Sequence, residues 1–213
     1  MRCQYLCDCE SVAYADDVLH TADLSVIGTW VTQEWRSACL NVVEAAPQAH
    51  PLYGPAHGTC CVIVGAFENL ATGRTLGNVP LSELLSVHGS AFETVLGTPG
   101  SDWGAIQVRG YAYGCDAGLD WHRDGSVFAG TAVIYVHENW HAGWGGILTV
   151  VPPCGREFEL EPIPNRMIIM RGDQKHKVSS WRGPQNSARL TANLSFLTRI
   201  GCFAANHPWT PRE

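Results

Sequence analysis

The sequence lacks the long patterned runs that mark several classes of protein. No apolar stretch approaches the roughly 20 residues of a membrane-spanning helix, and the N-terminus lacks the long apolar segment of a secretory signal. It has no basic stripe, and its net charge of −6 argues against nucleic-acid binding. We expect a soluble, cytoplasmic protein that binds neither nucleic acid nor membrane. Its oligomeric state is not predicted.

Cysteine is plentiful, but the spacing of a zinc site is missing. Nine cysteines are present; Cys3, Cys7 and Cys9 cluster near the start, and Cys60 and Cys61 are adjacent. Structural zinc sites usually combine two closely spaced cysteines with a second ligand pair at a set distance, and that pattern does not occur here. Without a secretory signal, we expect reduced thiols that pack as small apolar groups.

The two halves of the chain show different patterns. In residues 1–100, apolar spacing predicts a helix over Thr32–Glu44, and the apolar run Cys60–Gly65 predicts a buried strand. A second helix is expected to begin at Pro80, because proline is favoured at the first helical position, and to continue through Val95.

From residue 104 onward, short β-like segments alternate with Gly and Pro. Eight strands at this spacing suggest a sandwich or jelly roll, with the two helices bracing one sheet. The predicted strands are Ala105–Tyr113, Gly118–Arg123, Gly130–Val136, Gly146–Val151, Arg156–Glu161, Arg166–Arg171, His176–Val178 and Ala188–Thr198.

His122 and Asp124 lie two residues apart on one predicted strand, so both side chains point to the same face. A later histidine, His176, could complete a two-His-one-carboxylate set, which occupies one face of an octahedral metal and leaves the other open. Each of the three could also be an ordinary surface side chain. The ordered series of His122, Asp124, Gly145–Leu148, His176 and Arg189 is far more specific than an H-x-D pair alone.

Arg189, Thr191 and Asn193 alternate along the last predicted strand and therefore share one face. A planar guanidinium presents parallel donors that fit a carboxylate. Arg189 is therefore suited to bind a carboxylate. Arg182, in the preceding loop, is the alternative residue for this role.

A rival motif lies at His137-Glu138-Asn-Trp-His141. H-E-x-x-H binds zinc when it lies on a helix, with the Glu as general base. Here β-branched residues precede the motif, and Gly143, Gly145 and Gly146 follow it, which disfavours a helix. We interpret the segment as a polar loop and keep a zinc hydrolase as a weaker alternative.

Through these motifs, residues 105–198 resemble the Fe(II)- and 2-oxoglutarate-dependent dioxygenases, in particular the prolyl-4-hydroxylase-like branch. The matching segments are Arg109–Gly114, Trp121–Asp124, Val133–Trp140, Trp144–Leu148, Ile163–Met170, Lys175–Val178 and Ser187–Phe196. The first hundred residues do not share the resemblance.

The resemblance implies an all-β core with flanking helices, the cupin-like jelly roll known as a double-stranded β-helix. It implies Fe(II) held by His122, Asp124 and His176, with 2-oxoglutarate held by Arg189. O2 would be the second co-substrate, and ascorbate is a candidate reductant. One oxygenase domain is expected over residues 1–213, with 1–100 as a support and lid region and 101–200 as the catalytic core.

In the prolyl-4-hydroxylase-like branch, which this sequence resembles, a tyrosine from an earlier strand often reaches the same carboxylate of 2-oxoglutarate. Tyr111, Tyr113 and Tyr135 are the candidates, and Tyr111 and Tyr135 are favoured. Thr191 or Asn193 could add a hydrogen bond.

The leading hypothesis is a dioxygenase that hydroxylates an unactivated C–H bond of a small amino-acid-like or peptide-like substrate. Arg123 is predicted to anchor this substrate, and Trp140 and Trp181 to wall it, although simple exposure or packing explains these residues equally well. The alternatives are a protein prolyl hydroxylase and a jelly-roll metal-binding or sensor protein without turnover.

Overall fold

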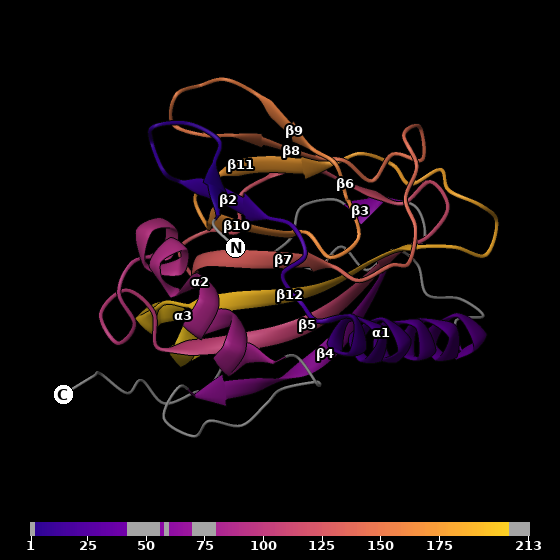
Figure 1. The fold of residues 1–213 in the computed structure, drawn as a ribbon, viewed down its shortest axis with the longest axis horizontal. Coiled ribbons are helices and arrows are strands. Elements are labelled where there is room, and N and C mark those ends of the chain that lie inside the picture. Colours follow the sequence, from indigo (N-terminus) through magenta and orange to yellow (C-terminus); the bar gives the residue numbers. More distant parts are fainter. Residues whose placement is uncertain (1–2, 42–55, 58–59, 70–79, 205–213) are drawn as a thin grey trace.

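The computed structural model describes residues 3–41, 56–57, 60–69 and 80–204 (Figure 1). Within them, the strands form two sheets in which all named pairs are antiparallel. The larger sheet has the order β1 (Gln4–Tyr5), β2 (Val12–Ala15), β10 (Met167–Arg171), β7 (Phe128–Tyr135), β12 (Arg189–Leu197), β5 (Ala105–Tyr113) and β4 (Cys60–Asn69).

The smaller sheet has the order β3 (Ala56–His57), β6 (Gly118–His122), β11 (Lys175–Val178), β8 (Leu148–Val151) and β9 (Phe158–Leu160). In Figure 1 it lies over one face of the larger sheet, while helices α1 (Thr21–Asn41) and α2 (Leu81–Leu96) lie on the other side. A short helix, α3 (Arg199–Ala204), follows β12. None of the helices described is long and apolar enough to cross a membrane.

The larger sheet separates two apolar clusters. On β12, alternate residues from Leu190 to Phe196 face the helices, where the Phe196 ring packs 5.3 Å from the Phe92 ring of α2 and 4.8 Å from the Trp103 ring. Tyr111 and Tyr135 belong to the cluster between the two sheets. The two-residue period of a strand therefore assigns each side chain of β12 to one of two environments.

The two-sheet jelly roll predicted from the strand pattern is confirmed. All eight predicted strands are present, with ends that agree within two residues. The strand predicted over Cys60–Gly65 is present as the longer β4, and α2 runs through Val95 as expected, with Pro80 as its N-cap residue.

The N-terminal half departs from the prediction in two ways. The helix expected to begin at Thr32 begins eleven residues earlier and is described over Thr21–Asn41, while residues 42–44 lie outside the described part of the chain. Gly28 interrupts its apolar pattern, but a Cβ there would lie 2.7 Å from the backbone oxygen of Val136, so glycine permits a close approach. Strands β1, β2 and β3 were not predicted, because segments of two to four residues carry too little periodicity.

The expectation of reduced thiols was wrong for one pair. The structure joins Cys7 and Cys9 in a disulfide, because the turn before β2 brings their Cα atoms within 5.3 Å. Among the described residues, Cys3, Cys115, Cys154 and Cys202 are free thiols.

Candidate active site

Two adjacent strands of the smaller sheet bring His122 and His176 together. They are cross-strand partners of β6 and β11, with ring centroids 4.1 Å apart. Asp124 follows β6, and its Oδ1 lies 3.7 Å from Nε2 of His122 and 3.8 Å from Nε2 of His176. The three ligand atoms lie within 4.8 Å of one another and could hold one metal ion.

Backbone carbonyls fix the orientation of both imidazoles. Nδ1 of His122 lies 2.8 Å from the oxygen of Asp120, and Nδ1 of His176 lies 2.9 Å from the oxygen of Gln174. A neutral ring that donates from Nδ1 keeps its lone pair on Nε2, which here faces Asp124. Such orienting bonds are typical of metal-ligating histidines.

Asp124 is buried and is held by a neighbouring strand. The Thr131 hydroxyl of β7 donates to Oδ2 at 3.2 Å, which leaves Oδ1 toward the two histidines. Burial and the neighbouring His176 lower the pKa of His122, against the raising effects of its bond to Asp120 and of the Asp124 carboxylate. The neutral, ligand-competent ring therefore persists to lower pH than usual.

Arg189 begins β12 and points into the space between the sheets. It is only 2% exposed, and its Nη2 donates to the Tyr135 hydroxyl at 3.3 Å. Three buried polar atoms on this face of β12 have no hydrogen-bond partner: Arg189 Nε, Thr191 Oγ1 and Asn193 Oδ1. Unsatisfied buried polar groups are costly, and the guanidinium and the hydroxyl are donors suited to a carboxylate.

The three candidate tyrosines differ in their contacts with Arg189. The Arg189 guanidinium lies 4.9 Å from the ring centres of both Tyr113 and Tyr135. Tyr111 stacks on Tyr113, with ring centroids 6.4 Å apart. Tyr113, which sequence reasoning did not favour, thus contacts Arg189 directly; its cross-strand pairing with Arg189 explains why. Arg182, the reserve arginine, is exposed.

Gly146 makes room for Arg189. Its φ is +68°, and a Cβ there would lie 2.8 Å from Arg189 Cδ and 3.0 Å from Trp181 Cε3. The Trp181 ring is 1% exposed and packs against the rings of His137 and Trp144. Gly146, just before β8, therefore lies close to both Arg189 and Trp181, and a larger residue there would displace one or both.

The other two residues predicted to contact substrate lie nearer the surface. Arg123 is exposed and donates to the backbone oxygen of Asp173. Trp140 is half-buried, and its indole N–H donates to the oxygen of Gly145 at 3.0 Å.

The zinc hydrolase alternative is wrong. Residues His137–His141 follow β7 without forming a helix, so the two histidines do not share one helical face. His137 is buried, whereas His141 is exposed and packs against the Trp144 ring.

His137 is part of the site, although the sequence reasoning assigned it to a polar loop. Its Nε2 lies 2.7 Å from the Pro162 oxygen, and its ring lies 5.9 Å from the Tyr135 ring. Its position two residues after Tyr135 was the available signal, since such residues share a face in extended chain. Burial, above all, lowers the pKa of His137 to about 4, and the Arg189 charge adds to this effect.

The depressed pKa of His137 predicts a specific loss of stability in acid. The unfolded chain takes up this proton near pH 6.5, but the folded protein does so only near pH 4. The stabilisation is therefore complete above pH 6.5 and falls by about 3 kcal/mol as the pH drops to 4. Urea unfolding should show this fall in the difference between wild type and His137→Gln. A difference between wild type and His137→Gln that does not change with pH would contradict the prediction.

Residues 106–196 match the family model of the 2OG-Fe(II) oxygenase superfamily. The fold is similar to a prolyl-4-hydroxylase from Pseudomonas putida, with 16% identity, a TM-score of 0.59 and coverage of 89% of this chain and 93% of that one. It is also similar to a prolyl hydroxylase from Trichoplax adhaerens, solved with a peptide fragment of the hypoxia inducible factor oxygen degradation domain. There the identity is 16%, the TM-score 0.61, and the coverage 92% of this chain and 87% of that one.

A third similar structure is the α-ketoglutarate-dependent epimerase SnoN of nogalamycin biosynthesis, with 11% identity, a TM-score of 0.51 and coverage of 88% of this chain and 76% of that one. No curated protein sequence matches this chain. The predicted double-stranded β-helix is confirmed by these likenesses, and the family implies Fe(II), 2-oxoglutarate and O2 as cofactor and co-substrates. The segment that matches the 2OG-Fe(II) oxygenase superfamily model, residues 106–196, carries the His-Asp-His group and Arg189.

Proposed function

We propose that this protein is an Fe(II)- and 2-oxoglutarate-dependent hydroxylase of a small amino-acid-like or peptide-like substrate. One observation carries the proposal: a metal-competent His-Asp-His group and a buried arginine with an unpaired Nε both face the space between the two sheets. The whole chain, residues 1–213, would form one oxygenase domain, since β2 and β4 extend the larger sheet and α1 and α2 cover it.

His122, Asp124 and His176 would hold the iron. Their donor set of two imidazole nitrogens and one carboxylate oxygen suits Fe(II) and leaves coordination positions open. Bound iron and 2-oxoglutarate would supply O2 activation coupled to release of succinate and CO2. Asp120 and Gln174 would orient the imidazoles through their carbonyl oxygens, and Thr131 would hold the carboxylate.

Arg189 would bind the distal carboxylate of 2-oxoglutarate. The guanidinium is already positioned by the Tyr135 hydroxyl and by the rings of Tyr113 and Tyr135. Its unpaired Nε and the Thr191 hydroxyl would donate to the carboxylate, while Tyr111 and Asn193 lie on the same face. A buried cation that lacks a complete set of partners gains most when an anion binds beside it.

The substrate assignment depends on charge and on exposure. The net charge is −6, so a polyanionic substrate is unfavourable. We keep Arg123 and Trp140 as the proposed substrate contacts, because both retain exposed surface. Trp181 is buried, so its role would be to position Arg189. The peptide in the Trichoplax adhaerens complex supports peptide-like chemistry as one form of substrate.

Replacing His122 by Ala should abolish stoichiometric Fe(II) binding, because the remaining two ligands cannot hold the ion in place. Mn(II) can replace Fe(II) in this test, so anaerobic titration with Mn(II), followed by electron paramagnetic resonance, measures the loss of metal binding. His141→Ala is the control and should bind one ion as wild type does. Full affinity in His122→Ala, with loss in His141→Ala, would refute the ligand assignment.

Replacing Arg189 by Ala should weaken 2-oxoglutarate binding by on the order of 2–5 kcal/mol, the usual effect of losing one partner of a buried charge pair. Calorimetry of the Mn(II)-loaded protein measures the affinity. Arg182→Ala, which alters an exposed arginine, should bind normally. Normal binding by Arg189→Ala, with weakened binding by Arg182→Ala, would assign the carboxylate contact to Arg182 instead.

Gly146→Ala should weaken 2-oxoglutarate binding at least about tenfold, because the new Cβ displaces Arg189 and Trp181. Gly143→Ala is a matched control: its φ is also positive, at +97°, but no atom lies within 4 Å of the added Cβ. Both variants should lose stability through backbone strain. Equal 2-oxoglutarate affinity in the two variants would show that the contact with Arg189 is unimportant.

The reaction itself is tested by substrate-stimulated succinate formation. A set of free amino acids, short peptides and a proline-rich polypeptide should include a small molecule that raises the rate, with a product heavier by one oxygen atom from labelled O2. Stimulation by the polypeptide alone would replace this proposal with a protein prolyl hydroxylase. Retention of metal without any stimulation would favour a binding or sensor protein.

A further inference from the structure

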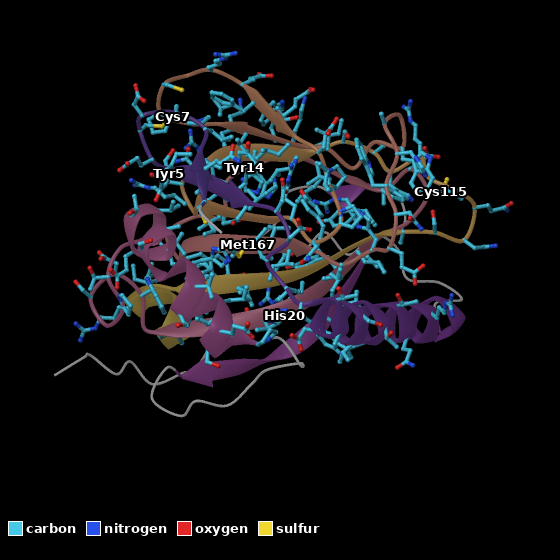
Figure 2. The ribbon with its side chains drawn as sticks, viewed as in Figure 1. Tyr5, Cys7, Tyr14, His20, Cys115 and Met167 are labelled. Carbon is cyan, nitrogen blue, oxygen red and sulfur yellow. A yellow bond between two sulfur atoms is a disulfide. The ribbon has the colours of Figure 1, made fainter. Side chains whose placement is uncertain are left out.

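Three cysteines that are far apart in the sequence meet away from the iron site. Cys7 and Cys9 lie in the loop between β1 and β2, and Cys154 lies in the turn between β8 and β9. Their sulfur atoms all lie within 4.8 Å of one another. Figure 2 labels Cys7, which lies beside the loop that joins β8 and β9 in Figure 1.

We propose that Cys7, Cys9 and Cys154, when reduced, form a second metal site, for a thiophilic d10 cation such as Zn²⁺. Three thiolates provide soft ligands that select such ions over Fe(II). Zn–S bonds of about 2.3 Å place tetrahedral sulfurs roughly 3.8 Å apart. The reduced Cys7 and Cys9 sulfurs would move apart to that spacing, and Cys154 already lies within 4.8 Å of both. The exposed side of Cys154 leaves a fourth position for water.

The backbone around the three sulfurs is already folded for such a site. The N–H of Glu10 donates to the oxygen of Cys7 at 3.1 Å, which closes the first loop into a turn. The N–H of Gly155 donates to the oxygen of Pro152 at 2.9 Å, which closes the second. Both segments join strands of the core, so the ligands meet without a large ordering cost.

A buried hydroxyl supports one of the ligands. Ser11 is 2% exposed, and its Oγ lies 3.4 Å from the Cys9 sulfur and 3.4 Å from Gln174 Oε1. Here the Ser11 hydroxyl donates to Gln174, and it would turn its single proton to the sulfur when Cys9 is a thiolate. Ser11 therefore resembles the orienting partners found around metal ligands.

The Cys7–Cys9 disulfide is the oxidised form of the same site. A phosphine and one water molecule reduce it: the S–S bond accepts two electrons and two protons, and the phosphine becomes its oxide. A bridge between residues two apart closes a very short loop, so it adds little stability through chain entropy. Metal binding to the thiolates would then compete with reoxidation.

Cadmium provides the test, because its thiolate complexes absorb in the ultraviolet whereas imidazole and carboxylate complexes do not. The full-length protein is reduced with a phosphine, desalted without oxygen and titrated with Cd(II). We expect one thiolate-bound Cd(II) per chain, and no such signal from the oxidised protein. Cys154→Ser and Cys9→Ser should each weaken binding at least about tenfold, since even the loss of an orienting partner costs 10–100-fold.

Two controls separate this site from other thiols. Cys115 is exposed and free, and Figure 2 shows it at the opposite end of the molecule from Cys7. Cys115→Ser should keep the signal, as should the Cys60→Ser/Cys61→Ser double variant. The proposal is overturned if reduced wild type gives no signal, if Cys154→Ser leaves it unchanged, or if the double variant abolishes it.

Discussion

The two-residue period of β12 is the constraint on which the site depends. Leu190, Leu194 and Phe196 enter the cluster beneath the helices, so Arg189 and Thr191 must point the other way. Because β12 lies between β5 and β7, the Arg189 guanidinium meets tyrosines from both neighbours. A register shift of one residue would bury apolar groups between the sheets and place the arginine against α1.

Burial gives these polar groups their chemical character. A guanidinium that is 2% exposed loses most of its water, and the hydroxyl and ring faces beside it replace that water only in part. An anion of matching shape can therefore bind there with more energy than it would gain at a surface arginine. The same environment keeps His137 neutral, so its ring adds no second positive charge beside Arg189.

The N-terminal half is joined to the site through the sheets. Strand β2 pairs with β10, and the N–H of Arg171 in β10 donates to the oxygen of Ser11 just before β2. The Ser11 hydroxyl in turn lies near the side chain of Gln174. The backbone oxygen of Gln174 accepts a hydrogen bond from Nδ1 of His176. Ser11 also lies 3.4 Å from the Cys9 sulfur, so it connects the loop of Cys7 and Cys9 to a proposed iron ligand.

The eight strands of residues 105–198 could be predicted from the sequence, because alternation and turn residues are local signals. The sequence also identified His122, Asp124, His176 and Arg189, whose order and residue types are chemically specific. Features that depend on strand register and on contacts between distant segments could not be predicted, because they arise only in the folded chain. Cross-strand pairing placed Tyr113 against Arg189, and burial made His137 a neutral support. Two turns nearly 150 residues apart brought Cys154 to Cys7 and Cys9. No local sequence pattern predicts these contacts, because they depend on how the two sheets pack together.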